Sequence, residues 1–240
     1  SWHERFKDLI EIPKMVVPRF VLPEDAKPGS KIRLLCVSDA ATNMGGAAIY
    51  AGVELSDNTF SCQLLTSKSR VMSNSIPRNE LESIRIGANL TYEVKNILKD
   101  AVSEIYFFTD SQVALSWCQN TGKKLRLFVL NRVSEIRRII KAMTPDSQDL
   151  PLYHIDGKVN TADLLTKPNP IRPSDLNSDS VWMIGYPWMK QDFSEMPILS
   201  YSDIQLSAQQ SQSLNKECFP DITFPNQNLN KDSSLNHCTR

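Results

Sequence analysis

The stretch IYFFTDSQVALSW, residues 105–117, changes its hydrophobic pattern at an aspartate. Large apolar residues run almost unbroken up to Thr109, and after Asp110 the apolar positions take on helical spacing. A buried strand that ends on a carboxylate and leads into a helix places an acid at the rim of a sheet. Taken alone, Asp110 is more simply interpreted as a cap at the start of that helix.

Strands and helices alternate over residues 31–167. The sequence predicts strands at 32–39, 45–55, 60–67, 104–110 and 150–156, a long helix at 77–99, two helices after Asp110 and a short helix opening at Asn160. The gap at 57–59 has the size of a hairpin turn, so the first three strands should form an antiparallel meander. The strand after the long helix should lie parallel to the first. The expected fold class is therefore α/β with a mixed sheet.

Composition divides the 240 residues into four parts. Residues 1–30 contain several prolines and should form an extended connection, residues 31–168 form the α/β domain, and residues 169–200 form a Trp- and Pro-containing packing segment. In that segment we expect Trp182, Pro187 and Trp188 to pack on the domain. Ser, Asn and Gln supply 16 of the residues in 201–240, which predicts a disordered linker or tail.

Charge, cysteine content and apolar runs exclude several classes of protein. The 27 basic and 27 acidic residues balance, so nucleic-acid binding would need a local patch. Five cysteines without a C-x-x-C pair indicate neither a zinc ribbon nor a disulfide framework, and fit a reducing, intracellular compartment. No apolar run approaches the roughly 18 residues of a membrane span, and the first residues do not resemble a signal peptide, so we expect no membrane association.

Two acids end neighbouring strands. Asp39 ends the first predicted strand and Asp110 ends the fourth, so in parallel neighbours the two carboxylates lie side by side at one edge of the sheet. Two like charges this close need a cation.

The long helix and the last helix each add an acid. Counted at 100° per residue, Glu80 lies in the middle of the apolar face of helix 77–99, whereas Glu82 and Glu93 fall on the solvent side. An ionised carboxylate that points inward is costly unless it is paired or binds a metal. Asp163 lies in the first turn of the last helix, with Asn160 as its N-cap.

The motifs around these acids resemble those of a known family. TDSQVAL, NELESI, SDAATNMGGAAIY and NTADLL are similar to the RNase H domain of retroelement reverse transcriptases. SKSRV, IPRNELESI, FVLNRV, NTADLLTK and VWMIGYPWM more closely resemble the Pao/BEL group of LTR retrotransposon polyproteins, over Trp2 to Trp188. The sequence departs from the family where LLTKP replaces a Ser-Arg-Gly ending and where ESI follows Leu81.

The resemblance implies a fold, an activity and partners. It implies an RNase H-like mixed five-stranded sheet flanked by helices, with Asp39, Glu80, Asp110 and Asp163 as the catalytic, metal-binding acids. The activity would be hydrolysis of the RNA strand of an RNA/DNA hybrid during reverse transcription. The upstream polymerase and downstream integrase of the same polyprotein would be partners, in cytoplasmic retroelement particles.

Four carboxylates at one sheet edge suit two Mg²⁺ ions about 4 Å apart, with Mn²⁺ as an alternative. Two other functions share this fold. A catalytically silent, hybrid-binding connection module would lack an acid, and all four acids are present. An integrase core would carry its glutamate last, whereas here the glutamate comes second.

Basic residues provide candidates for nucleic-acid contacts. The predicted helix 123–141 has a basic side, which could follow duplex phosphates or simply face solvent. Arg132 falls inside its apolar arc, so we expect an ion pair or a substrate contact there. His154 is interpreted as a strand residue. Arg78 and Lys68 could contact phosphate or belong to the ordinary surface. The nucleic-acid-binding candidates are Arg78, Lys123, Lys124, Arg126, Arg132, Arg137 and Arg138.

Overall fold

The computed structural model describes residues 7, 23–119, 125–166 and 177–205. By its internal contacts the chain divides into residues 1–204 and 205–240, and the account below concerns the first unit. The predicted tail therefore lies mostly outside the described residues, although residues 201–205 are helical. Among the described residues, no helix is long and apolar enough to cross a membrane.

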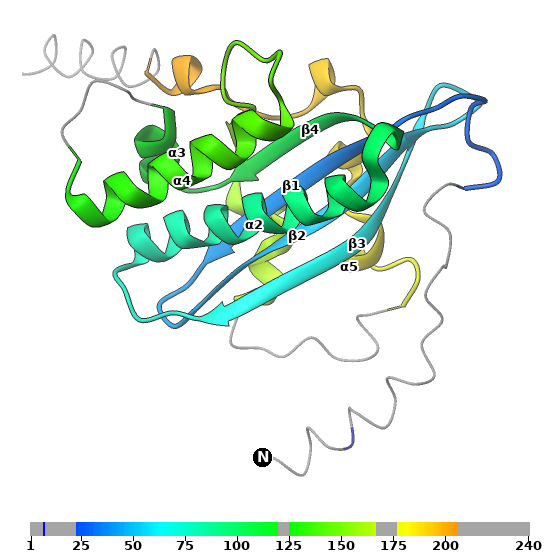
Figure 1. Cartoon of the computed structure of the whole chain (residues 1–240). Helices are drawn as coiled ribbons and strands as arrows, with labels where there is room; N and C mark the ends of the chain where they lie inside the picture. The colour runs from blue at the N-terminus through cyan, green and yellow to red at the C-terminus, as the bar shows by residue number, and fades with distance from the viewer. Residues whose placement is uncertain (1–6, 8–22, 120–124, 167–176, 206–240) are drawn as a thin grey trace, which may run out of the picture. The chain divides into compact units, whose positions relative to one another are not determined.

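The centre of the fold is a five-stranded mixed sheet in the order β3-β2-β1-β4-β5 (Figure 1). The strands are β1 Ile32–Ala40, β2 Met44–Glu54, β3 Phe60–Val71, β4 Val102–Thr109 and β5 Leu152–His154. Pairs β1–β2 and β2–β3 are antiparallel, whereas β1–β4 and β4–β5 are parallel. The predicted meander, the parallel fourth strand and the α/β fold class with five strands are confirmed.

Besides the helical residues 201–205, the described fold contains four labelled α-helices and five short 3₁₀ segments. The α-helices are α2 Ile76–Leu98, α3 Gln112–Gln119, α4 Leu127–Met143 and α5 Val181–Ile184. The 3₁₀ segments are η2 Lys99–Ala101, η3 Gly157–Val159, η4 Thr161–Leu165, η6 Pro187–Lys190 and η7 Phe193–Glu195. The helix predicted from residue 123 begins later, at Leu127, because the backbone of Arg126 is extended and forms its N-cap. Residues 120–124, which include Lys123 and Lys124, lie outside the described residues.

One face of the sheet is covered by α2 and α4 (Figure 1). Helix α2 lies directly on β1 and β2 at Gly87, where a Cβ atom would come within 2.6 Å of Cys36 Sγ and 3.1 Å of Ala47 Cβ. The two helices run in the same direction, since Arg78 contacts Phe128 near their starts and Arg85 contacts Glu135 further along. The N-termini of both helices therefore lie at the same end of the fold.

The position of Glu82 differs from the sequence prediction. Instead of facing solvent it is buried, and it forms ion pairs with Arg85 and with Arg132 of α4. Helical periodicity places Glu82 opposite the sheet, but it cannot reveal that a second helix covers that side. For Arg132 the sequence predicted an ion pair or a substrate contact, and the structure shows an ion pair with Glu82.

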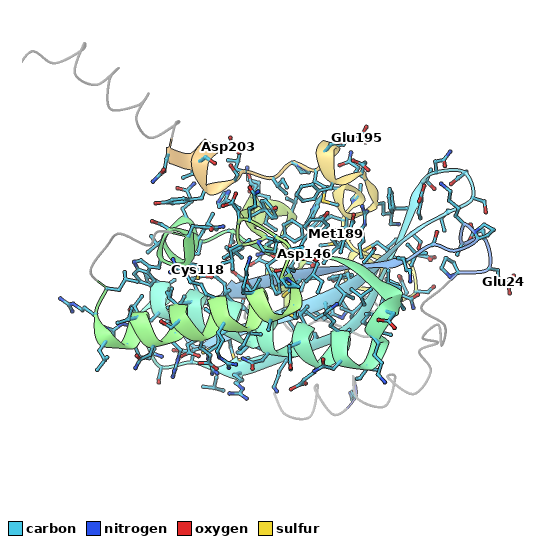
Figure 2. The ribbon with its side chains drawn as sticks, turned by 45° about the horizontal axis from the view of Figure 1, so that its top comes forward. Glu24, Cys118, Asp146, Met189, Glu195 and Asp203 are labelled. Carbon is cyan, nitrogen blue, oxygen red and sulfur yellow. The ribbon has the colours of Figure 1, made fainter. Side chains whose placement is uncertain are left out.

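The opposite face of the sheet is covered by residues 181–199, here called the C-terminal extension. Met189 and Glu195 of this extension lie on the side of the sheet away from α2 and α4 (Figure 2). Its side chains form a second hydrophobic cluster with β1, β2 and β4. The extension contributes Trp182, Met183, Trp188, Met189 and Met196, and the strands contribute Leu35, Val37, Ala48, Tyr50 and Phe108.

Candidate active site

The first two acids meet because their strands are parallel neighbours. Asp39 is the penultimate residue of β1, and Asp110 follows the last residue of β4. The register pairs Ser38 with Thr109, so both acids emerge at the same sheet edge. Each of Asp39, Glu80 and Asp110 offers a carboxylate oxygen within 4.8 Å of the other two. The three acids thus form one cluster.

Glu80 enters the cluster from the first turns of α2. Its carboxylate accepts a hydrogen bond from the Ala40 backbone N–H, but its Oε2 is buried with no partner among the described residues. Burial, followed by the charges of Asp39 and Asp110, raises the pKa of Glu80 to about 9. Without a cation Glu80 is therefore protonated at neutral pH.

Residues of β5, of η3 and at the N-cap of η4 contact the backbone and the carboxylate of Asp110. His154 Nε2 lies 3.1 Å from the Asp110 backbone oxygen, and the Asn160 side chain hydrogen bonds to the carboxylate. A Cβ atom on Gly157 would come within 2.8 Å of Asp110 Oδ2, so glycine leaves room for this carboxylate. Asp110 Oδ1 is buried without a partner in the described chain. Burial and then the charge of Asp39 raise the pKa of Asp110 to about 6.

Asp163 lies beside the cluster. Asn160 caps its 3₁₀ segment η4 by accepting a hydrogen bond from Ala162 N–H at 3.1 Å, as predicted. The Asn160 amide also donates to the Ser38 carbonyl at 3.0 Å, which ties η4 to the end of β1. The charge of Asp163 acts on Asp110, but its carboxylate is not among the three that lie within 4.8 Å of one another.

Thr166 is a site residue that the sequence analysis missed. It is buried, and its hydroxyl donates a short hydrogen bond to Asp39 Oδ2. The signal in the sequence was its place three residues after Asp163, where one 3₁₀ or helical turn returns a side chain to the same side.

The cluster has the chemistry of a site for hard divalent cations. Its candidate ligands are carboxylate oxygens only, the type of ligand that Mg²⁺ and Mn²⁺ prefer. Glu80 and Asp110 each have a buried carboxylate oxygen to which no described residue donates, and such an oxygen is costly unless something satisfies it. A cation between them would satisfy both.

The basic residues predicted to bind nucleic acid lie in different surroundings. Arg132 pairs with Glu82, and Arg137 donates its Nε hydrogen to the Cys118 carbonyl at 2.7 Å, so both make contacts within the fold. Arg126 and Arg138 are exposed. The guanidinium of half-buried Arg78 lies 5.2 Å from the ring centre of Phe128. Arg78 and Arg126 flank the helix starts at the end of the fold that carries Glu80.

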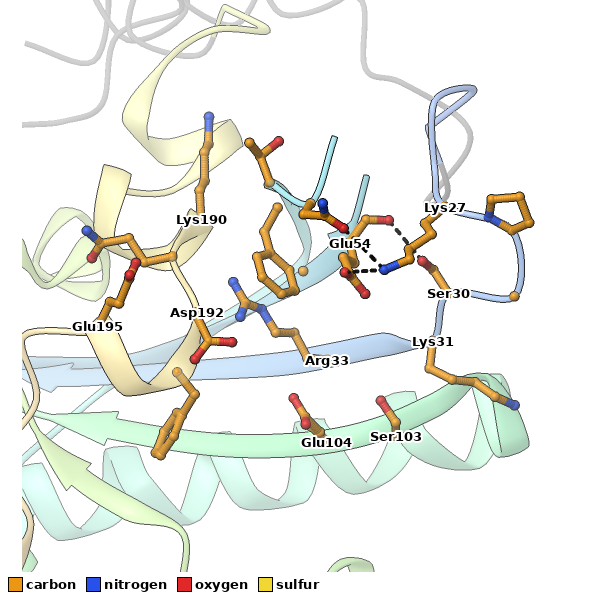
Figure 3. A pocket seen from close by; sticks show the side chains of 18 residues that line it. Lys27, Ser30, Lys31, Arg33, Glu54, Ser103, Glu104, Lys190, Asp192 and Glu195 are labelled. Atoms are coloured by element: carbon orange, nitrogen blue, oxygen red, sulfur yellow. Dashed lines mark hydrogen bonds and ion pairs between the residues drawn. The ribbon is translucent and has the colours of Figure 1, made fainter. Parts of the chain in front are cut away.

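A polar cavity of about 870 Å³ lies away from the acids (Figure 3). The buried Arg33 reaches into it with its guanidinium 3.8 Å from the centre of the Phe60 ring, and Nη2 donates to the Met189 carbonyl at 2.7 Å. Arg33 and Asp39 are six residues apart on β1, or about 20 Å in a strand. The cavity is therefore separate from the acidic cluster.

A family model matches the first part of the chain. Residues 1–111 match the family model described as Pao retrotransposon-like RNaseH-like domain, which confirms the resemblance to the Pao group over a segment that includes Asp39, Glu80 and Asp110. No curated protein matches the chain.

Three solved structures are similar at low sequence identity. The N-terminal RNase H domain of rv2228c from Mycobacterium tuberculosis, solved as a fusion with maltose binding protein, is 15% identical with a TM-score of 0.38, covering 57% of this chain and 91% of that one. LC11-RNase H1 in complex with an RNA/DNA hybrid is 20% identical with a TM-score of 0.39, covering 56% and 93%. RNase H1 from the halophilic archaeon Halobacterium salinarum NRC-1 is 12% identical with a TM-score of 0.37, covering 56% and 93%.

Proposed function

We propose, from the premise that residues 1–111 match the Pao retrotransposon-like RNaseH-like family, that this chain is a ribonuclease H of a retroelement. It would hydrolyse the RNA strand of an RNA/DNA hybrid during reverse transcription, with divalent cations as cofactors. The observation that carries the proposal is the cluster of Asp39, Glu80 and Asp110, in which two carboxylate oxygens are buried and have no hydrogen-bond partner among the described residues.

The chain's own residues divide the work of the site. Asp39, Glu80 and Asp110 would hold two Mg²⁺ or Mn²⁺ ions, with Asp163 completing the set from the side. When bound, such ions supply an activated water and neutralise the charge on the leaving oxygen of a phosphodiester. Thr166 fixes the orientation of Asp39, and Gly157 leaves room for Asp110. Because Glu80 holds a proton in the absence of a cation, cation binding should release a proton.

A catalytically silent hybrid-binding module is the alternative. Such a module gains nothing from keeping several buried carboxylates together, because their repulsion and desolvation only destabilise the fold. All four acids are present, and three of them converge on one point. The active enzyme is therefore the better supported function.

The end of the fold that carries Glu80 also offers contacts for a charged substrate. Arg78 and Arg126 lie at the starts of α2 and α4, where their positive charges can bind the phosphates of a duplex. Such contacts would position a hybrid without reading its sequence. The polymerase and integrase regions of a polyprotein, as neighbours in the chain, belong to the same proposal.

Cleavage and binding of an end-labelled RNA/DNA hybrid, measured side by side in Mg²⁺, test the proposal. In the Asp110→Asn variant cleavage should fall by at least about 100-fold, because the amide keeps the size of the side chain but removes the charge that holds the ions. Hybrid affinity should stay within about threefold of the parent, since phosphate contacts are retained.

A matched control is Asp156→Asn, an exposed acid that caps η3 and lies outside the cluster. It should cleave like the parent. Near-parental cleavage by Asp110→Asn would refute the assignment of the acids. Hybrid binding without any cleavage by the parent would favour the silent module.

A further inference from the structure

The C-terminal extension is tied to the acidic site by polar contacts as well as by apolar packing. Trp188, in η6, is buried in the second hydrophobic cluster and donates its indole N–H to the Val159 carbonyl at 3.0 Å. Val159 directly precedes Asn160, which caps η4 and hydrogen bonds to Ser38. The Trp188 N–H therefore holds the chain just before the segment that carries Asp163.

The same tryptophan also contacts the strand that carries Asp110. Its ring packs edge-on against Phe108, with ring centres 5.0 Å apart and planes at 74°. Phe108 lies two residues before Asp110 on β4, and its ring is completely buried. One rigid side chain thus touches the supports of two acids that arrive from different elements.

A second tie from the extension reaches Asp110 by another route. Leu199 and His154 exchange two backbone hydrogen bonds of 2.9 Å each, which add a short bridge to β5. The His154 ring in turn lies 3.1 Å from the Asp110 carbonyl oxygen. Trp188 and Leu199 of the extension therefore each contact a residue that lies next to the acidic cluster or supports it.

We propose that the C-terminal extension is a positioning element of the metal site, and that the Trp188 indole N–H is the contact that sets Asp163 relative to Asp110. This inference rests on the proposed function for what the site binds. Trp188 contacts Val159 and Phe108, so it would act on the acids through these two residues. An extension that only covered the sheet would need the apolar area of Trp188 but not its N–H.

The indole N–H can be removed while an aromatic ring is kept, by Trp188→Phe. Trp182→Phe is the matched control, because Trp182 is buried in the same cluster but its indole forms no hydrogen bond found within the described part of the chain. The two variants lose similar apolar area. Trp188→Phe also leaves the Val159 carbonyl without its donor, so its melting temperature should fall somewhat further, and Trp182→Phe measures the part of the fall that comes from apolar packing alone.

Two measurements separate positioning from packing. The first is backbone amide exchange, read by mass spectrometry over residues 157–166 without metal, which should become about fivefold faster in Trp188→Phe and stay unchanged in Trp182→Phe. The second is calorimetric titration with Mn²⁺ in the absence of nucleic acid. Trp188→Phe should bind Mn²⁺ about tenfold more weakly than the parent, as expected when the support of a ligand is lost.

Each outcome decides the matter. Equal exchange and equal Mn²⁺ affinity in the two variants would overturn the inference and leave the proposed function intact. Loss of folding in Trp188→Phe alone would overturn it in favour of a structural role. If the parent neither binds Mn²⁺ nor cleaves hybrid, the proposed function fails. Faster exchange confined to Trp188→Phe would still show that the Trp188 hydrogen bond stabilises η4.

Discussion

At the scale of single residues, the three clustered acids differ in how their carboxylate oxygens are satisfied. Glu80 and Asp110 each keep a buried oxygen without a hydrogen bond in the described chain. Asp39 differs, because the Thr166 hydroxyl donates to it. A hydroxyl donor to one carboxylate oxygen favours a single rotamer of that side chain.

Replacing Thr166 tests this division. Thr166→Val has nearly the same shape but leaves Asp39 without its donor, so we expect cleavage to fall about tenfold and the Mg²⁺ concentration for half-maximal cleavage to rise. Thr166→Ser keeps the hydroxyl and should retain most activity. The measurement is hybrid cleavage across a Mg²⁺ titration. Equal curves for the two variants would show that the hydroxyl plays no part in the site.

At the scale of secondary structure elements, much of the site could be predicted from the sequence. Asp39 and Asp110 end apolar strands, and the chain order makes those strands parallel neighbours. Glu80 lies on the apolar arc of its helix, and the structure places its carboxylate beside theirs. These inferences succeed because strand ends and helix faces are local properties, which periodicity reports directly.

Other features depend on contacts between distant elements and could not be predicted. The burial of Glu82 requires knowing that α4 lies along α2, and the hydrogen bond from Thr166 requires knowing how η4 returns to β1. The supporting contacts of His154 and Trp188 likewise join residues more than 25 positions apart. Amphipathic pattern indicates that a face is buried but does not say which partner buries it.

The turn η3 gives a prediction at this scale. Adding a methyl group in Gly157→Ala should displace the Asp110 carboxylate, because the new Cβ would lie 2.8 Å from its Oδ2. The displaced group is the end of a side chain, so the melting temperature should change little while cleavage falls at least about tenfold. The neighbouring, exposed Lys158→Ala is the control and should keep its activity. Parental cleavage by Gly157→Ala would mean that Asp110 adapts without loss.

At the scale of the whole described unit, the sheet separates two hydrophobic clusters with different origins. The cluster under α2 and α4 comes from elements whose periodicity is evident in the sequence. The cluster on the other face depends on the C-terminal extension, which forms short helical turns without a long amphipathic pattern. Its Trp and Met side chains bury sheet residues such as Tyr50, whose hydroxyl donates to the Trp182 carbonyl at 2.8 Å. The C-terminal extension thus covers the sheet face next to the acids.

The acidic cluster also links the stability of the whole unit to pH and to metal. The pKa of Glu80 is raised from 4.5 to about 9 in the folded protein, so folding is favoured when Glu80 is protonated. This contribution is fully present below about pH 4.5 and is lost as the pH rises through about 9. The pKa of Asp110 is raised only to about 6, so it adds little to the change above about pH 7.

In a metal chelator, the free energy of unfolding should therefore fall between about pH 7 and 9, by at most about 1.4 kcal/mol per pH unit. Glu80→Gln cannot ionise and should lose most of this slope, with a higher melting temperature than the parent at about pH 8.5. Mg²⁺ replaces the proton, so it should stabilise the parent more at about pH 8.5 than at about pH 7, and it should stabilise Glu80→Gln only weakly. Thermal unfolding of both proteins over this pH range, with chelator or Mg²⁺, measures all three effects. A parent whose stability stays flat in chelator would show that Glu80 is already ionised without a cation, and a Mg²⁺ effect independent of pH would show that the cation does not displace its proton.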